Sequence, residues 1–273
     1  MKKALVFGGS GAAGQSAVRA LRKQYGDEVL ILATTSKEAP VEGADQTITG
    51  CDVANENYAD KIVSKIEQPL DYFIFTPARG NLGFPVSETS DGDLKEALAF
   101  SFDPMVHLEK VLSPALTISY SAYYYLPHLL DFYGSMGFVK LRQELWTLES
   151  PQKRKIIRAG SFYSQSVRGI SILLQRLAKQ GKNPSLSEML SEQKQSGKKF
   201  DAFFLDYVAS RENDVLKDNF PDIDYRMTTA EDLSWALTQL ISGEKKPILS
   251  VMGAWRWTDD KLPEMPAFYD RIR

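Results

Sequence analysis

The chain has 273 residues, of which 43% are hydrophobic and 25% charged, so it can bury a full core within one α/β domain. Its net charge of −2 at pH 7 excludes a strong electrostatic attraction to nucleic acid or to an anionic membrane as the basis of its function. A single cysteine excludes an internal disulfide, and with only two histidines beside it we predict no metal site.

The first apolar run, residues 4–7, is too short for the core of a signal peptide, and no later run approaches the length of a membrane span. We therefore expect a cytoplasmic protein with no membrane partner. Small molecules remain the expected ligands.

Short apolar runs alternate with segments of helical period along the chain, which is typical of a parallel sheet with helices on both faces. The runs predict seven strands, at residues 3–7, 28–33, 46–50, 72–76, 115–120, 155–159 and 248–252. The fold class is thus predicted to be α/β, as a Rossmann-type doubly wound sheet in a single NAD(P)-binding domain over residues 1–273.

Four glycines, Gly8, Gly9, Gly11 and Gly14, follow the first predicted strand and lead into a helix-like stretch at 12–25. In a nucleotide-binding turn the first glycine allows the bend, a middle one lets a pyrophosphate approach, and the last lets the helix pack on its strand. We expect the pyrophosphate at the helix N-terminus. The predicted contacts are Gly8, Ser10, Gly11, Ala12 and Gly14.

The end of the second strand reads Thr34-Thr35-Ser36-Lys37, where a dinucleotide fold that binds NAD usually carries an acidic side chain. Three hydroxyls and a lysine suit a phosphorylated ribose, so they favour NADP(H) over NAD(H). The alternative is a polar turn with its lysine in water.

Two further strand ends are predicted to touch the dinucleotide. After the third strand, Asp52 could take the adenine amino group while Val53 caps the ring, and Asp52 could also be the N-cap of the next helix. After the fourth strand, the segment Thr76, Pro77 and Ala78 would pass beside the nicotinamide ribose. The role of Arg79, as a phosphate contact or an exposed loop residue, stays open.

A tyrosine and a lysine that could act together follow the fifth predicted strand. Tyr133 precedes Lys140 by two helical turns at the predicted start of a helix, which would place both on one face. We expect the ammonium to lower the pKa of the phenol, which suits a proton donor to an oxygen that gains charge during hydride transfer.

Residues 169–219 lie where the strand pattern lapses, and they predict one or more helices over the sheet, in an insertion around 165–220. Such an insertion is typical of a substrate lid, with a solvated excursion as the alternative. Beyond it, Thr228-x-x-Glu231 has the form of a capping box that opens a helix. The rings of Tyr120, Tyr123, Tyr124 and Tyr125 could line an acyl pocket or pack in the core.

In the order of these motifs the chain resembles the short-chain dehydrogenase/reductase superfamily. Its Tyr-x6-Lys spacing, with Leu116-Thr117-Ile118-Ser119-Tyr120 before it, is similar to the enoyl-acyl-carrier-protein reductases. The resemblance implies that Tyr133 donates a hydrogen bond to the thioester carbonyl, that Lys140 binds the hydroxyls of the nicotinamide ribose, and that Tyr120 is a second active-site tyrosine. It also implies that Gly160 and Ser164 meet the cofactor, and a homodimer or homotetramer paired through the helix with the Tyr and Lys.

We therefore predict an NADPH-dependent oxidoreductase that reduces the activated C=C of an enoyl thioester. Two departures keep alternatives open: the glycine run has the Gly-x-x-Gly-x-x-Gly form of atypical members, and the interval from Tyr120 to Tyr133 is longer than in enoyl reductases. One alternative is a ketone or aldehyde reductase that uses Ser121 with Tyr133 and Lys140. Another is a non-catalytic NADP-binding sensor or scaffold.

Overall fold

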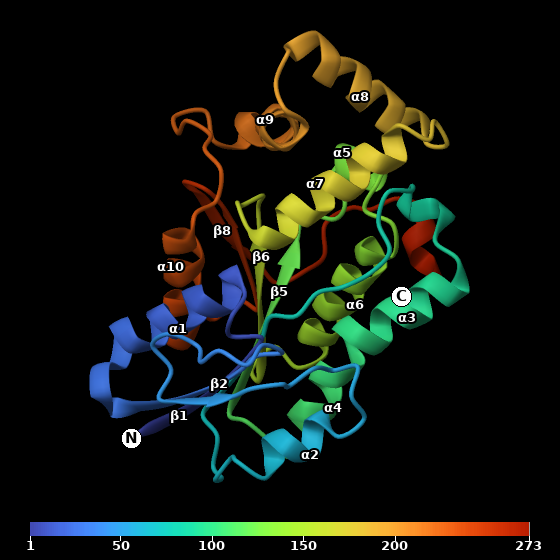
Figure 1. Ribbon diagram of the computed structural model, residues 1–273. Helices are drawn as coiled ribbons and strands as arrows, with labels where there is room; N and C mark the ends of the chain where they lie inside the picture. Colours follow the sequence, from blue (N-terminus) through green and yellow to red (C-terminus); the bar gives the residue numbers. More distant parts are fainter. Residues whose placement is uncertain (273) are drawn as a thin grey trace.

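The computed structural model describes residues 1–272, and its centre is one sheet of eight strands (Figure 1). The strand order is β3-β2-β1-β4-β5-β6-β7-β8, and only the last pair is antiparallel. The order reverses between β1 and β4, which marks the crevice where open α/β sheets bind ligands. The strands are β1 (Lys2–Phe7), β2 (Val29–Thr34), β3 (Gln46–Ile48), β4 (Tyr72–Phe75), β5 (Leu116–Ala122), β6 (Arg154–Ala159), β7 (Ile248–Met252) and β8 (Trp255–Asp259).

Helices cover both faces of this sheet (Figure 1). They are α1 (Ala12–Tyr25), α2 (Tyr58–Val63), α3 (Asp91–Ser101), α4 (Asp103–Leu112), α5 (Pro127–Leu130), α6 (Ser135–Glu149), α7 (Gln165–Ala178), α8 (Pro184–Ser196), α9 (Phe200–Leu216) and α10 (Ala230–Ile241). None of the helices within residues 1–272 is long and apolar enough to span a membrane.

The two faces of β1 show why its last four residues, 4–7, are all apolar. Ala4 and Val6 pack in the cluster formed with α1 and α10, whereas Leu5 and Phe7 pack in the cluster formed with α2 and α4. A parallel strand that is buried on both faces cannot alternate polar and apolar residues. The predicted doubly wound sheet is therefore confirmed.

All seven predicted strands are present, with ends that agree within two residues. The sequence reading missed β8, which carries Trp255, Arg256 and Trp257 in a short mixed run. It returns antiparallel to β7 through a turn in which Gly253 adopts φ +60°, a conformation that favours glycine. The eighth strand is thus set by a turn and by pairing rather than by its own composition.

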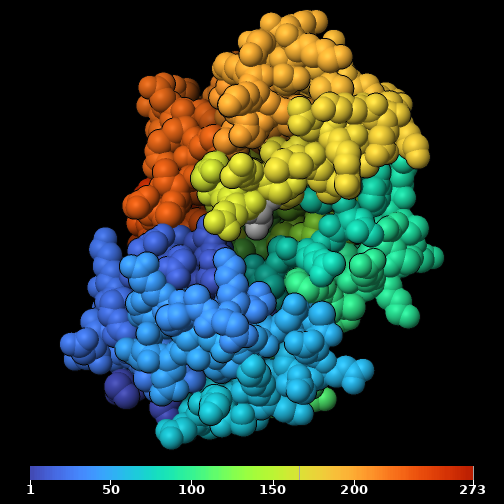
Figure 2. All heavy atoms as spheres, viewed as in Figure 1, coloured from blue at the N-terminus to red at the C-terminus, as the bar shows by residue number. Residues whose placement is uncertain are grey.

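Helices α7, α8 and α9 lie beyond the carboxyl ends of β5 and β6 and share a cluster of their own (Figure 1). Leu174, Leu186 and Phe204 are buried where the three helices meet. In Figure 2 this yellow and orange part stands above the blue amino-terminal half, with a hollow between them. The predicted helices of the 169–219 region are confirmed, and the first of them begins at Gln165.

The helix that carries Lys140 is enclosed within its own chain. Phe138 and Leu141 of α6 are buried against the carboxyl-terminal segment that carries Phe268 and Tyr269. Most residues of α6 are buried, and Glu149 at its end is exposed. The predicted pairing of two copies through this helix stays a prediction.

Candidate functional site

In the turn between β1 and α1, the chain packs so closely that side chains would not fit at Gly9 and Gly14. A Cβ on Gly14 would lie 2.3 Å from the carbonyl oxygen of Gly8, and one on Gly9 would lie 2.9 Å from the Cβ of Ala33. Gly8 itself has φ +83°. These contacts bring the start of α1 down onto the end of β1, as the glycine spacing predicts.

The N-terminus of α1 is free to receive an anion. Its N-cap, Gly11, provides no side-chain hydrogen bond, and the first turn carries no acidic residue. The N–H groups of the first turn of a helix have no partner within the helix, so those of Ala12, Ala13 and Gly14 are available donors. Together with the helix dipole they fit a pyrophosphate.

The four polar residues at the end of β2 fall into two pairs, one buried and one exposed. Thr34 is buried and accepts the Gly8 N–H at 3.0 Å, while Thr35 is buried and donates to the Ser10 hydroxyl, also at 3.0 Å. Their hydroxyl groups thus hold the glycine turn. Ser36 and Lys37 are exposed beside it and could meet a phosphorylated ribose.

The two further strand ends also lie at this edge. Asp52 accepts the Ala54 N–H at 2.9 Å, and α2 begins at Tyr58 with Asn57 as its N-cap, so the N-cap alternative for Asp52 is wrong. Val53 packs against the core cluster of α2 and α4. The helix starts later because residues 52–57 form turns first.

The segment after β4 packs against the glycine turn that follows β1. Thr76 donates to the carbonyl oxygen of Phe7 at 2.9 Å, and Pro77 lies where a Cβ on Gly8 would meet it at 3.2 Å. Thr76 and Ala78 line a cavity of about 450 Å³, and so does Arg79, whose exposed guanidinium lies 5.3 Å from the Phe100 ring centroid.

This cavity joins the nucleotide turn to the predicted catalytic residues. Its wall includes Gly11, Ala12 and Ala13 at one end, and Tyr120, Ser121, Tyr133 and Lys140 beside them. Gly160 and Ser164, after β6, complete the same wall. A volume of this size is typical of a small-molecule site.

The placement of Tyr133 differs from the sequence prediction in two ways. Tyr133 precedes α6, which begins at Ser135 after Gly134 with φ +49°, so it is not on a helical face with Lys140. Burial raises the pKa of its phenol well above the usual value, and the expected lowering by the ammonium is therefore wrong. The phenol keeps its proton at neutral pH, which suits a donor.

Lys140 is held at the wall of the cavity. Its ammonium donates to the carbonyl oxygen of Tyr120 at 2.8 Å and to the side-chain oxygen of Gln143 at 3.1 Å. Burial lowers its pKa to about 8, partly offset by the Glu144 carboxylate. Because an ammonium has three donors, one remains for a ligand.

The end of β5 supplies two hydroxyls to the cavity wall. The Tyr120 hydroxyl is buried and has no hydrogen-bond partner in the described part of the chain, and burial raises its pKa. The Ser121 hydroxyl donates a long hydrogen bond, of 3.4 Å, to the carbonyl oxygen of Ala122. A buried hydroxyl without a partner is costly, so a ligand group or water at Tyr120 would stabilise this site.

The four tyrosines at and after the end of β5 do not form one pocket. Tyr120 packs toward α1 and α10, Tyr123 packs with Trp255, and Tyr124 and Tyr125 pack toward α6 and the carboxyl-terminal segment. Only Tyr120 and Tyr123 line the cavity. The core-packing alternative therefore holds for Tyr124 and Tyr125, because consecutive residues point to different sides of the chain.

Helices α7 and α9 complete the cavity with residues that the sequence reading did not single out. The apolar ones are Val167, Ile170, Phe204, Leu205 and Val208. The polar one, Glu212, is buried and accepts the Ser161 N–H at 2.9 Å and the Tyr225 O–H at 2.7 Å. No local pattern marks Glu212, because its partner Ser161 lies 51 residues away in the chain.

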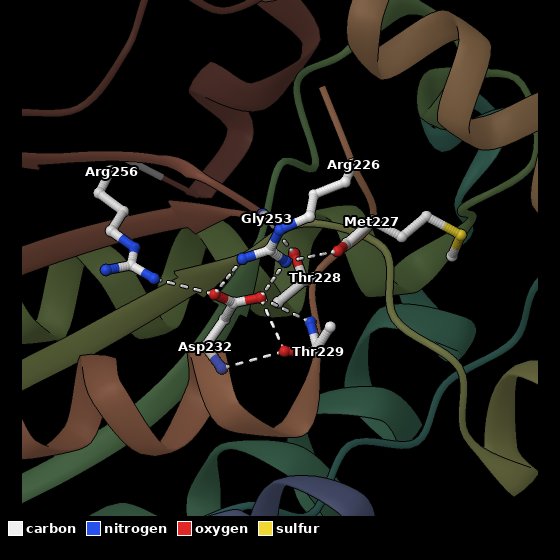
Figure 3. Close-up of polar contacts among 7 residues, drawn as sticks. All are labelled: Arg226, Met227, Thr228, Thr229, Asp232, Gly253 and Arg256. Atoms are coloured by element: carbon white, nitrogen blue, oxygen red, sulfur yellow. Dashed lines mark hydrogen bonds and ion pairs between the residues drawn. The ribbon is translucent and has the colours of Figure 1, made fainter. Parts of the chain in front are cut away.

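At the start of α10, the Asp232 carboxylate accepts hydrogen bonds from several donors (Figure 3). It pairs with Arg226 at 2.6 Å and Arg256 at 3.0 Å, and it forms the capping box of α10 with Thr229. The predicted box of Thr228 and Glu231 is thus wrong by one residue. Thr228 instead accepts the Gly253 N–H and donates its own N–H to the carbonyl oxygen of Ser161, in the cavity wall.

We expect Asp232→Ala to lower the free energy of unfolding by about 1–2 kcal/mol, because it removes the box and leaves two arginines unpaired. Burial alone would raise the pKa of Asp232, but hydrogen bonds from Arg226 and Thr229 lower it to about 2. A depressed carboxyl pKa stabilises the fold above about pH 4, and this contribution is lost as the pH falls toward 2.

Urea unfolding at pH 7 and at pH 3 measures this contribution. The control is Glu231→Ala, which removes an exposed carboxylate from the same helical turn. Equal losses for the two variants at pH 7 would show that the Asp232 contacts contribute nothing of their own.

No family model matches this sequence, and no curated protein matches it. Among solved structures, a short-chain dehydrogenase family protein from Francisella tularensis is similar with a TM-score of 0.61 and 14% identity, over 89% of this chain and 92% of that one. YwfH, an NADPH-dependent reductase involved in bacilysin biosynthesis, is similar with a TM-score of 0.57 and 12% identity, over 94% and 99%. The chain therefore has the short-chain dehydrogenase fold.

Proposed function

We propose that this chain, which has the fold of short-chain dehydrogenases, is an NADP(H)-dependent oxidoreductase that reduces the activated C=C bond of an enoyl thioester. The observation that carries the proposal is that one cavity brings together the N-terminus of α1, the Tyr133 phenol and the Lys140 ammonium. An anion site, a neutral proton donor and a buried cation are the groups that a hydride transfer to an acyl compound needs.

The residues of the nucleotide edge fit a dinucleotide. The close glycine turn and the free donors of α1 suit its pyrophosphate. When bound, the reduced nicotinamide supplies the hydride that goes to the β-carbon of the substrate. Gly160 and Ser164 would border the nicotinamide from the β6 side.

The protein groups then act on the thioester oxygen, which gains negative charge as electrons leave the double bond. The Tyr133 phenol donates a hydrogen bond to that oxygen and stabilises the enolate. Lys140 keeps a positive charge below a pH of about 8, orients the ribose through its remaining donor and lowers the energy of the nearby negative charge. A proton from solvent water then adds to the α-carbon, and the enolate collapses to the saturated thioester.

The lid side of the cavity supports an acyl substrate. Val167 and Ile170 of α7 line the cavity together with Phe204 and Val208 of α9, and Phe132 adds an aromatic ring to the same wall. A hydrocarbon chain gains about 0.8 kcal/mol for each CH₂ that it buries in such surroundings. Helices α7 and α9 thus act as a lid that binds the apolar part of the substrate.

A ketone reductase is the second candidate, because the Ser121 hydroxyl lines the same cavity as Tyr133. The two are distinguished by incubating the protein with NADPH and crotonyl thioester, and separately with acetoacetyl thioester, while following cofactor oxidation. Oxidation with the crotonyl compound alone supports the proposal. Oxidation with the acetoacetyl compound alone favours the ketone reductase, and binding of NADPH without turnover favours a sensor.

We expect Lys37→Ala to weaken binding of NADPH about tenfold and to leave binding of NADH unchanged, because a cation beside the ribose meets only the phosphorylated form. Fluorescence titration with both dinucleotides measures the two Kd values. Lys23→Ala, at the exposed far end of α1, is the control. Equal weakening of both dinucleotides would place Lys37 away from the ribose phosphate.

A further inference from the structure

We infer that Gln143 is a positioning residue for Lys140, which fixes its ammonium so that one N–H points into the cavity. The inference rests on the proposed function, in which Lys140 binds the ribose of the dinucleotide. Gln143 lies three residues after Lys140 on α6, and both side chains are buried, with 1% and 5% of their surfaces exposed. Residues three apart are neighbours on a helix surface.

The ammonium of Lys140 has two fixed acceptors that come from different elements. One is the carbonyl oxygen of Tyr120 on β5, at 2.8 Å, and the other is the side-chain oxygen of Gln143, at 3.1 Å. With two of its three donors engaged, the direction of the third is determined. Because Lys140 lines the cavity, that third donor faces the ligand space.

The orientation of the Gln143 amide is itself fixed. Its nitrogen donates to the carbonyl oxygen of Ser101, at the end of α3, at 3.0 Å. A rotated amide would place a donor against the ammonium and would lose the bond to Ser101. The Gln143 oxygen is therefore held toward Lys140.

This hydrogen-bond chain continues to the loop after β4, which also lines the cavity. The Ser101 hydroxyl accepts the N–H of Arg79 and donates to the carbonyl oxygen of Arg79, each at 2.7 Å. Arg79 lies in the loop after β4, which lines the cavity beside Thr76. Gln143 thus connects the cation of α6 to the loop expected beside the ribose.

The charges around Lys140 make this position sensitive to pH. Glu144 of α6 is paired with Arg158 of β6 and also receives the Tyr124 hydroxyl. The other titratable groups that line the cavity come from five places in the fold: Tyr120 of β5, Tyr123 after it, Tyr133 before α6, Arg79 of the β4–α3 loop and Glu212 of α9. Since Gln143 is neutral, it solvates the ammonium without adding a charge to this set.

The test is the pH dependence of NADPH binding, followed by fluorescence, with kcat/KM recorded beside it. In the unaltered protein the affinity should fall as Lys140 loses its proton, with a midpoint near pH 8. Gln143→Leu removes one acceptor of the ammonium and should move the midpoint down by about one pH unit. Gln143→Glu, which keeps the shape, should move it up by at least about one unit.

Thr147→Val is the matched control, because Thr147 is buried on α6 and its hydroxyl donates to the backbone oxygen of Gln143 without contact to Lys140. The inference is overturned if Gln143→Glu leaves the midpoint in place, or if the control moves it equally. A midpoint that moves as expected in a protein that reduces no thioester would support the inference and refute the proposed reaction. If the variants reduce the thioester but the midpoint of NADPH binding does not move, the proposed reaction is supported and the inference about Gln143 is refuted.

Discussion

Tyr133→Phe should lower kcat/KM for the thioester substrate by about 100-fold or more, with the Kd for NADPH unchanged. The phenol is the neutral donor in the cavity, since burial raises its pKa, and loss of a general acid or oxyanion donor typically costs this factor. Phenylalanine keeps the ring, so the packing of the cavity wall should survive. Steady-state kinetics and dinucleotide titration together measure the two quantities.

Tyr163→Phe is the control for this experiment, because Tyr163 is 69% exposed just after β6. It should leave both the rate and the affinity unaltered. A Tyr133→Phe variant with the unaltered rate would remove the phenol from the mechanism. A loss of NADPH binding in that variant would instead make Tyr133 a cofactor residue.

Arg158→Met should reduce the free energy of unfolding by about 3–5 kcal/mol, with a fall in Tm on the order of 10 °C. The Arg158 guanidinium meets the Glu144 carboxylate through two hydrogen bonds, at 2.9 and 2.7 Å, and both side chains are almost fully buried. Without the arginine, the Tyr124 hydroxyl is the one hydrogen-bond donor that the buried Glu144 carboxylate keeps among residues 1–272. Thermal unfolding followed by circular dichroism measures the loss.

A second variant distinguishes the unpaired charge from lost packing. In Glu144→Leu combined with Arg158→Met, both charges are replaced by apolar side chains, so most of the stability should return. As an exposed comparison, Lys198→Met breaks a surface pair with Asp206 and should cost less than about 1 kcal/mol. If Arg158→Met costs no more than that, the buried pair does not stabilise the fold.

The strands and the nucleotide turn could be predicted because their signals are local. Most of the parallel strands contain an apolar run that is buried on both faces, and only glycine fits at positions 9 and 14. The packing of residues 262–272 against α6 could not be predicted in the same way. No local signal shows which segment covers a helix.

The geometry of the candidate site was predicted only in part. Tyr133 and Lys140 line one cavity, but α6 begins at Ser135 after Gly134, so the loop before α6 brings Tyr133 to this cavity. The pKa of the phenol follows its burial, which depends on elements far along the chain. Gln143 and Glu212 have no sequence signature, because Ser101 and Ser161 become their partners only after folding.

The sequence by itself determined the doubly wound sheet, the glycine turn and the set of side chains that can do chemistry. These follow from periodicity and from steric limits that act over a few residues. The tertiary structure alone decided which helices enclose the cavity, which donors stay free and how burial moves each pKa. Those properties depend on water being excluded by segments distant in the sequence, and no short pattern encodes that exclusion.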